Sequence, residues 1–228
     1  AQRAGWVTVM ATLALALVCG SLLLRRQAGH PAPMLPVDLF KRPLFALSAM
    51  TSACSFTVQG IAFVSLPFYL QRVLHRSAVE TGLLITPWAV VVALAAPFAG
   101  RLSDRHAPGL LGGVGLAVLC VGMVSMAMLT PEASTADIVL RMVVCGAGFG
   151  FFQSPNLKAL MSAAPPERAS GASGIIALAR LTGQTTGAAL VALCFGLGAE
   201  RGPLWALGLG AGFAAVASIT SFARLRFQ

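Results

Sequence analysis

Residues 81–130 read TGLLITPWAVVVALAAPFAGRLSDRHAPGLLGGVGLAVLCVGMVSMAMLT, and every charge in this segment lies in the short turn between two uncharged stretches. The stretches 81–100 and 109–130 each approach the roughly 20 residues that an α-helix needs to cross the apolar core of a bilayer. In lipid a helix satisfies all its backbone polar groups internally. The segment therefore predicts two membrane-spanning helices joined by a polar turn.

Five further apolar stretches surround this hairpin, at residues 6–24, 44–70, 138–155, 171–198 and 204–222. Their only charges are Arg141 and Arg180. We therefore predict an all-α polytopic membrane protein with seven transmembrane helices. A signal peptide is the alternative for residues 6–24, but the stretch is long for one and no small-x-small cleavage site follows it before Arg25.

The composition agrees with a membrane protein. Of the 228 residues, 57% are hydrophobic and 10% charged, whereas a soluble domain carries about 25% charged residues. This balance argues against a soluble enzyme, a secreted disulfide module and a disordered chain. The five cysteines all lie in apolar stretches without CxxC spacing. We interpret them as packing residues and expect no metal, cofactor or catalytic residue.

The net charge of +9 suggests nucleic acid only until the cations are located. Ten fall on one side of the predicted membrane: Arg25, Arg26, Lys41, Arg42, Arg101, Arg105, Lys158, Arg168, Arg224 and Arg226. Four fall on the other: Arg3, Arg72, Arg76 and Arg201. The positive-inside rule then predicts a cytoplasmic C-terminus, an external N-terminus and no nucleic-acid partner. Because the chain starts outside without Met, we expect an even number of further spans upstream.

Local signals mark where helices begin. Ser77 and Glu80 have the spacing of a capping box before residue 81, and Ser134 and Asp137 repeat it before residue 138. Asp137 and Arg141 are four residues apart, which permits an ion pair on one helix face.

Polar residues inside spans are candidates for function, because intramembrane charge is costly. Arg180 lies near the middle of its span, with Gln184 one turn later on the same face. Two interpretations stay open for these side chains: they line a cavity, or they bond to neighbouring helices. The same two interpretations hold for Gln59. The internal ion pair is the favoured interpretation of Arg141.

The turn Gly100-Arg101-Leu102-Ser103-Asp104-Arg105 resembles the Gly-x-Leu-x-Asp-Arg loop of the major facilitator superfamily. Residues 66–71, 81–88, 146–156 (with Gln153 and Asn156) and 179–184 look like the matching regions of its fourteen-span, proton-coupled multidrug antiporters. The basic residues that usually follow the loop are missing at residues 106–109. A polar membrane turn remains the alternative.

The resemblance implies a linker helix and cytoplasmic loop at residues 1–43, followed by a C-terminal six-helix half at 44–228. It implies export of drugs or organic cations from the cell (inner) membrane by proton antiport. Gly100, Arg101, Asp104 and Arg105 would form a gating loop, and Gln59, Arg141, Gln153, Asn156, Arg180 and Gln184 are the candidate polar residues of the cavity or membrane interior.

No Asp or Glu lies in the middle of any predicted span. A proton antiporter needs a carboxylate whose pKa changes between access states. We therefore expect an upstream half to supply it, with the bilayer, the substrate and protons as the other partners. The alternative is a seven-span protein that does not transport, either receptor-like or a truncated accessory subunit.

Overall fold

The computed structural model describes residues 2–27, 37–198 and 201–227, and it confirms the all-α class within them. The long helices are α1 (Gln2–Gln27), α2 (Pro43–Arg72), α3 (Ala78–Leu102), α4 (Pro108–Ala127), α5 (Thr135–Ser162), α6 (Ala169–Leu197) and α7 (Gly202–Ala223). Three 3-10 helices are shorter: η1 (Val37–Lys41), η2 (Pro166–Arg168) and η3 (Arg224–Phe227). Each of the seven predicted spans falls mainly within one long helix.

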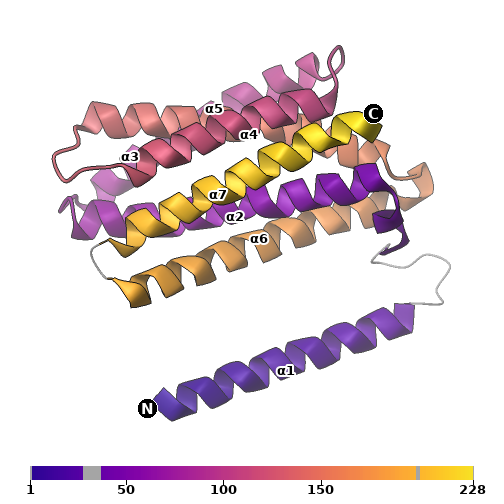
Figure 1. Ribbon diagram of the computed structural model, residues 1–228, viewed down its shortest axis with the longest axis horizontal. Coiled ribbons are helices and arrows are strands. Elements are labelled where there is room, and N and C mark those ends of the chain that lie inside the picture. The colour runs from indigo at the N-terminus through magenta and orange to yellow at the C-terminus, as the bar shows by residue number, and fades with distance from the viewer. Residues whose placement is uncertain (1, 28–36, 199–200, 228) are drawn as a thin grey trace.

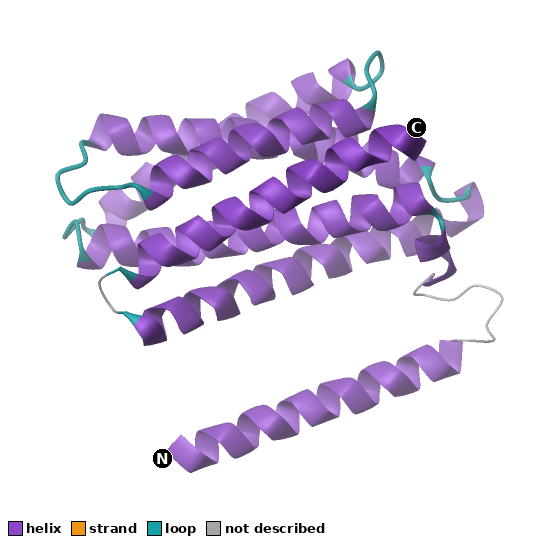
Figure 2. Ribbon diagram, in the orientation of Figure 1, coloured by secondary structure: helices purple, strands orange, loops and turns teal. Residues whose placement is uncertain are grey.

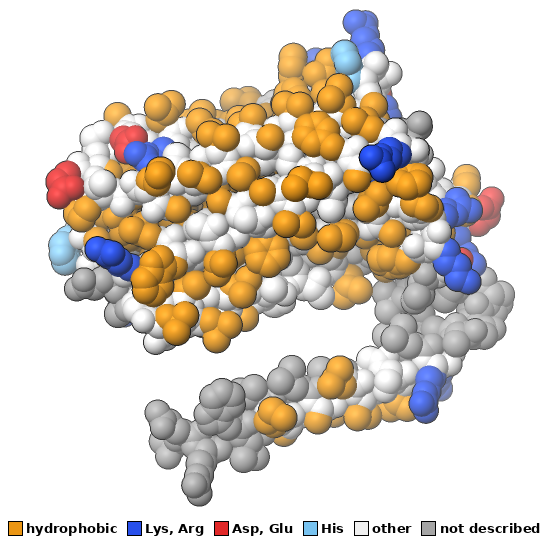
Figure 3. Space-filling model, in the orientation of Figure 1, with side chains coloured by type: hydrophobic (Ala, Val, Ile, Leu, Met, Phe, Trp, Pro, Cys, Tyr) orange, Lys and Arg blue, Asp and Glu red, His pale blue; other side chains and the backbone are white. Residues whose placement is uncertain are grey.

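Six of the described helices, α2 to α7, are long and apolar enough to cross a membrane. They run side by side as one bundle, and short loops join them at its two ends (Figures 1 and 2). Helix α1 carries a shorter apolar stretch, Met10–Leu22, and lies apart from the bundle (Figure 1). On the face shown in Figure 3, charged side chains gather toward the ends of the bundle and the band between them is hydrophobic or uncharged.

The bundle is built on α2 and α5. Helix α2 packs against α6 and α7, and α5 packs against α3 and α4. Helix α4 also packs against α7, which joins the two groups of helices. Helices α3 and α6 are thus each held mainly from one side. Only 17% of the most apolar stretch of α3 and 28% of that of α6 are buried, against 44–61% in the other four spans.

Glycines set the closest helix crossings. A Cβ added at Gly148 would lie 2.4 Å from the Leu119 nitrogen, and one at Gly187 would lie 2.5 Å from the Thr57 oxygen. The small-residue spacing in α5 and α6 thus lets backbones touch. In α7 the spacing Gly208-x-Gly-x-Gly212 predicts the same close packing between helices. This prediction is wrong at Gly208 and Gly212, where an added Cβ would meet nothing within 4 Å, and holds at Gly210.

Helix ends follow the predicted local chemistry. Ser77 and Glu80 form the reciprocal capping box at the start of α3, which confirms that prediction. The Ser134 hydroxyl accepts from the Asp137 backbone N–H at the start of α5. Each cap satisfies N–H groups that the first helical turn leaves open. All five cysteines are free, with Cys145 and Cys194 buried.

Candidate functional site

The turn between α3 and α4 is tied to the end of α5. Lys158 donates to the Asp104 carboxylate at 2.5 Å and to the Ser103 carbonyl at 3.1 Å. Asp104 and Lys158 are 69% and 47% exposed, so solvent screens the pair. The acid of the motif thus pairs with a lysine from α5, while Arg101 and Arg105 are exposed.

A second set of contacts holds the segment before α2 against the same end of the bundle. Arg168 of η2 pairs with Asp38 of η1 at 3.1 Å, and Arg42 donates to the Ala163 carbonyl at 3.0 Å. Leu39 is buried in one cluster with Phe45 and Leu160. Residues 37–42 therefore pack onto the bundle, while residues 28–36 of the expected linker lie outside the described residues.

Sequence reasoning missed a buried polar cluster around Arg224. This side chain is 0% exposed, although we counted it among the cations of the cytoplasmic tail. Its guanidinium donates to Asn156 Oδ1 and Ser221 Oγ, each at 2.5 Å, and to Ser48 Oγ at 3.0 Å. Asn156 in turn donates to Ser52 Oγ at 2.7 Å.

The Arg224 cluster joins α2, α5 and α7 at the end of the bundle that carries the C-terminus. Asn156, one of the candidate polar residues of the cavity or membrane interior, is 4% exposed, so its side chain lies inside the helix bundle. A sequence signal existed: Ser48 and Ser52 are one turn apart, as are Ser221 and Arg224, which gives each helix a short polar face.

The open side of the bundle carries the other intramembrane polar residues. Gln184 of α6 donates to Gln59 of α2 at 2.9 Å, and both are half-buried. Arg180, one turn before Gln184, is exposed, as is Gln153 of α5. Among the described residues the Arg180 guanidinium has no ion-pair partner. Arg180 and Gln184 thus lie close together on one side of α6.

One exposed aromatic ring continues the surface around Gln59, and two buried rings pack behind it. Phe63, one turn later on α2 and 37% exposed, lies 5.5 Å from the Trp88 ring of α3, measured between centroids. The Trp88 ring is followed by Phe149 of α5 at 6.1 Å. The buried Trp88 Nε1 has no hydrogen-bond partner. This wall therefore combines two amides, a cation and the exposed ring of Phe63, with the buried rings of Trp88 and Phe149 behind it.

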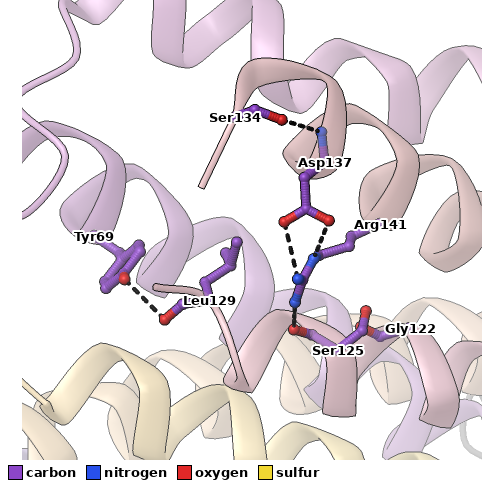
Figure 4. A network of polar contacts seen from close by, with 7 residues as sticks. All are labelled: Tyr69, Gly122, Ser125, Leu129, Ser134, Asp137 and Arg141. Carbon is purple, nitrogen blue, oxygen red and sulfur yellow. Dashed lines mark hydrogen bonds and ion pairs between the residues drawn. The ribbon is translucent and has the colours of Figure 1, made fainter. Parts of the chain in front are cut away.

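Arg141 lies in a different place, near the start of α5, whereas Arg224 contacts Asn156 nearer the end of that helix. Figure 4 shows the contacts of Arg141. Its guanidinium forms two contacts of 2.9 Å with the Asp137 carboxylate and also donates to the Ser125 carbonyl of α4. Nearby, the Tyr69 hydroxyl donates to the Leu129 carbonyl at 3.0 Å (Figure 4). Arg141 thus connects the start of α5 to the end of α4.

The described residues contain no cluster of His, Cys, Asp or Glu suited to a metal ion. The family model of the Major Facilitator Superfamily matches residues 1–188. The chain belongs to the Major Facilitator Superfamily. Six of its described helices are long and apolar enough to cross a membrane, and curated relatives of the chain carry transporter names.

Two relatives cover most of this Major Facilitator chain. The uncharacterized transporter YebQ of Escherichia coli (strain K12) is 46% identical over 225 residues, which are 99% of this chain and 49% of YebQ. The multidrug resistance protein Stp of Mycobacterium tuberculosis (strain ATCC 25618 / H37Rv) is 31% identical over 82% of this chain and 35% of its own length.

Relatives with a different printed function are also similar. The riboflavin transporter RibZ of Clostridioides difficile (strain 630) is 28% identical over 72% of this chain and 36% of its own length. This chain therefore spans about half the length, or less, of the curated relatives it matches. It is similar to transporters with different printed substrates.

Proposed function

We propose that this chain forms one half of a secondary transporter, which exports drugs or organic cations by alternating access and exchanges them for protons. In this proposal an upstream half is required for activity. The transporter lies in the cell (inner) membrane, with the C-terminus of this chain in the cytoplasm. The relatives that carry multidrug names, Stp and the multidrug efflux pump LfrA of Mycolicibacterium smegmatis, support the substrate class.

The observation that carries the proposal is Arg180, an exposed cation in the middle of an apolar helix. In a bundle that stood alone in lipid this guanidinium would face hydrocarbon, at a cost of at least about 2.5–3.5 kcal/mol. Helices α3 and α6 are also the least buried spans. A second helical bundle that covers both helices removes this cost and encloses a cavity between the halves.

The wall around Gln59, Gln184 and Phe63 suits a flat, lipophilic substrate. Aromatic rings bind cations and planar ligands, and a few amides fix their orientation. The described membrane interior of this half carries arginines and no mid-span carboxylate. The carboxylate that exchanges protons therefore belongs to the upstream half in this proposal.

Expression of the two halves, together and apart, in a host that lacks its own efflux pumps tests the proposal. We expect resistance to ethidium and quaternary ammonium compounds only when both halves are present. We expect Arg180→Ala to lower drug-driven proton flux about tenfold or more, and Arg180→Lys to retain part of it. Resistance from the 228 residues alone would overturn the requirement for a second half, and unchanged flux in Arg180→Ala would make Arg180 structural.

The Asp104–Lys158 pair gives a separate prediction about the gating turn. Since both side chains are largely exposed, Asp104→Asn is expected to change the free energy of unfolding by less than about 1 kcal/mol. Transport is expected to fall severalfold, because the pair links the turn to α5 in one access state. The reversed pair Asp104→Lys/Lys158→Asp should recover transport, as measured in proteoliposomes.

The matched control is Asp38→Asn, which removes another exposed ion pair at the same end of the bundle. We expect it to leave transport unchanged. Equal losses in Asp38→Asn and Asp104→Asn would contradict a specific role for the turn, as would failure of the reversed pair.

A further inference from the structure

Helix α7 has an open groove where its sequence predicts tight packing. A groove of about 1230 Å³ lies between α7 and the ends of α2, α4 and α6 that are nearest Arg201. Gly208 and Gly212 line it, and a Cβ at either position would meet only open space. The absence of side chains at Gly208 and Gly212 therefore shapes the groove. Arg180, Asp104 and Lys158, the charged residues used in the proposed function, do not line it.

The groove has the length of one membrane leaflet. Its lining on α7 runs from Leu204 to Val216, which at 1.5 Å per residue is about 18 Å. Half of the roughly 30 Å apolar core of a bilayer is about 15 Å. A transmembrane helix would have to cross the whole core, so a groove of this length fits a lipid chain better than it fits α1.

The chemistry of the groove changes along its length. Most of its lining is apolar, and the Tyr69 hydroxyl is already bonded to the Leu129 carbonyl. At the end of the bundle it reaches Trp205, 48% exposed, and the exposed Arg201. Tryptophan is typical of the membrane interface, and an arginine beside it attracts a phosphate group.

We propose that this groove binds one glycerophospholipid of the leaflet on the Arg201 side, with an acyl chain over Gly208 and Gly212 and its phosphate at Arg201. A transported organic cation fits less well, because the charged side chain that lines the groove, Arg201, is itself a cation and would repel it. This groove presents one cation at its rim. The inference goes beyond the proposed function, and it holds whether or not the protein exports drugs.

The test uses the complete protein in nanodiscs of phosphatidylcholine that contain a minor fraction of phosphatidylglycerol with a diazirine on its acyl chain. After photolysis, peptide mapping is expected to find label concentrated on residues 205–216 and 127–131. Filling the groove by Gly208→Leu/Gly212→Leu should lower this label about tenfold. Gly196→Leu on α6 is the matched control, since its Cβ also meets open space outside the groove, and it should change nothing.

A separate pair of variants tests the contact between the lipid phosphate and Arg201. Arg201→Gln is expected to lower phosphatidylglycerol labelling in the groove about tenfold, the value of one charge-assisted phosphate contact, and Arg201→Lys should retain most of it. Even labelling of the exposed faces of α4 and α7, unchanged in all variants, would overturn the proposal by showing only annular lipid. A disulfide formed in the same nanodiscs between Gly208→Cys and a cysteine introduced in residues 10–22 would overturn it in favour of docking of α1.

Discussion

Gly148→Ala is expected to destabilise the bundle by about 1–3 kcal/mol, and Gly148→Leu to prevent its folding. The Cβ of the alanine would lie 2.4 Å from the Leu119 nitrogen and 2.6 Å from the Gly115 oxygen. Both atoms belong to the backbone of α4, so no side-chain rotation relieves the clash. The two helices must move apart along a crossing that holds the most closely packed part of the bundle.

Gly208→Ala is the matched control, because its Cβ meets no atom within 4 Å. Both variants make the same chemical change in a membrane helix, so the gain in helix propensity is the same. Size-exclusion chromatography after heating in detergent measures the folded fraction of each. We expect the midpoint to fall for Gly148→Ala and to stay level or rise for Gly208→Ala. Equal midpoints would show that α4 and α5 do not pack as closely as described.

The comparison of these two glycines shows how far the sequence alone leads. Apolar stretches and capping residues are local signals, so they predicted the helices and the box at Ser77 and Glu80. Gly146-x-Gly-x-Gly150 and Gly208-x-Gly-x-Gly212 have the same spacing, yet Gly146, Gly148 and Gly150 all face neighbouring atoms within 3.0 Å, whereas Gly208 and Gly212 face none within 4 Å. Spacing describes one helix and carries no information about which neighbour faces it.

In the candidate site, too, the sequence predicts what depends on one helix and not what depends on its neighbours. The exposed Arg180 and its neighbour Gln184 stood out because they interrupt the apolar stretch 171–198, where a polar side chain is costly. Arg224 did not, because it follows the apolar stretch 204–222 by two residues and resembles an ordinary cytoplasmic cation. Its burial depends on Ser48 and Asn156, which are 176 and 68 residues away in sequence. Only the packed bundle brings these three side chains together.

Asn156→Leu is expected to cost more stability than Arg224→Met, although it removes a neutral member of the cluster and Arg224→Met removes the charged one. Arg224 is fully buried, and the acceptors that the structure gives it are the uncharged oxygens of Asn156, Ser48 and Ser221. Loss of the Asn156 oxygen leaves a buried guanidinium short of an acceptor, at a cost of about 3–5 kcal/mol. Arg224→Met leaves only neutral groups unpaired, at about 1–3 kcal/mol.

The double variant Asn156→Leu/Arg224→Met separates this mechanism from loss of packing. With the charge and its acceptor both removed, three serines remain. Ser48 and Ser221 bond to the backbone carbonyls of Leu44 and Gly109, and Ser52 loses its bond from Asn156 equally in Asn156→Leu and in the double variant. We therefore expect the double variant to be more stable than Asn156→Leu by at least about 1 kcal/mol, a coupling typical of directly bonded residues. Thermal midpoints of the four proteins in detergent measure it. Additive losses would mean that the two side chains stabilise the bundle independently, and that the burial of the charge is not what makes Asn156 necessary.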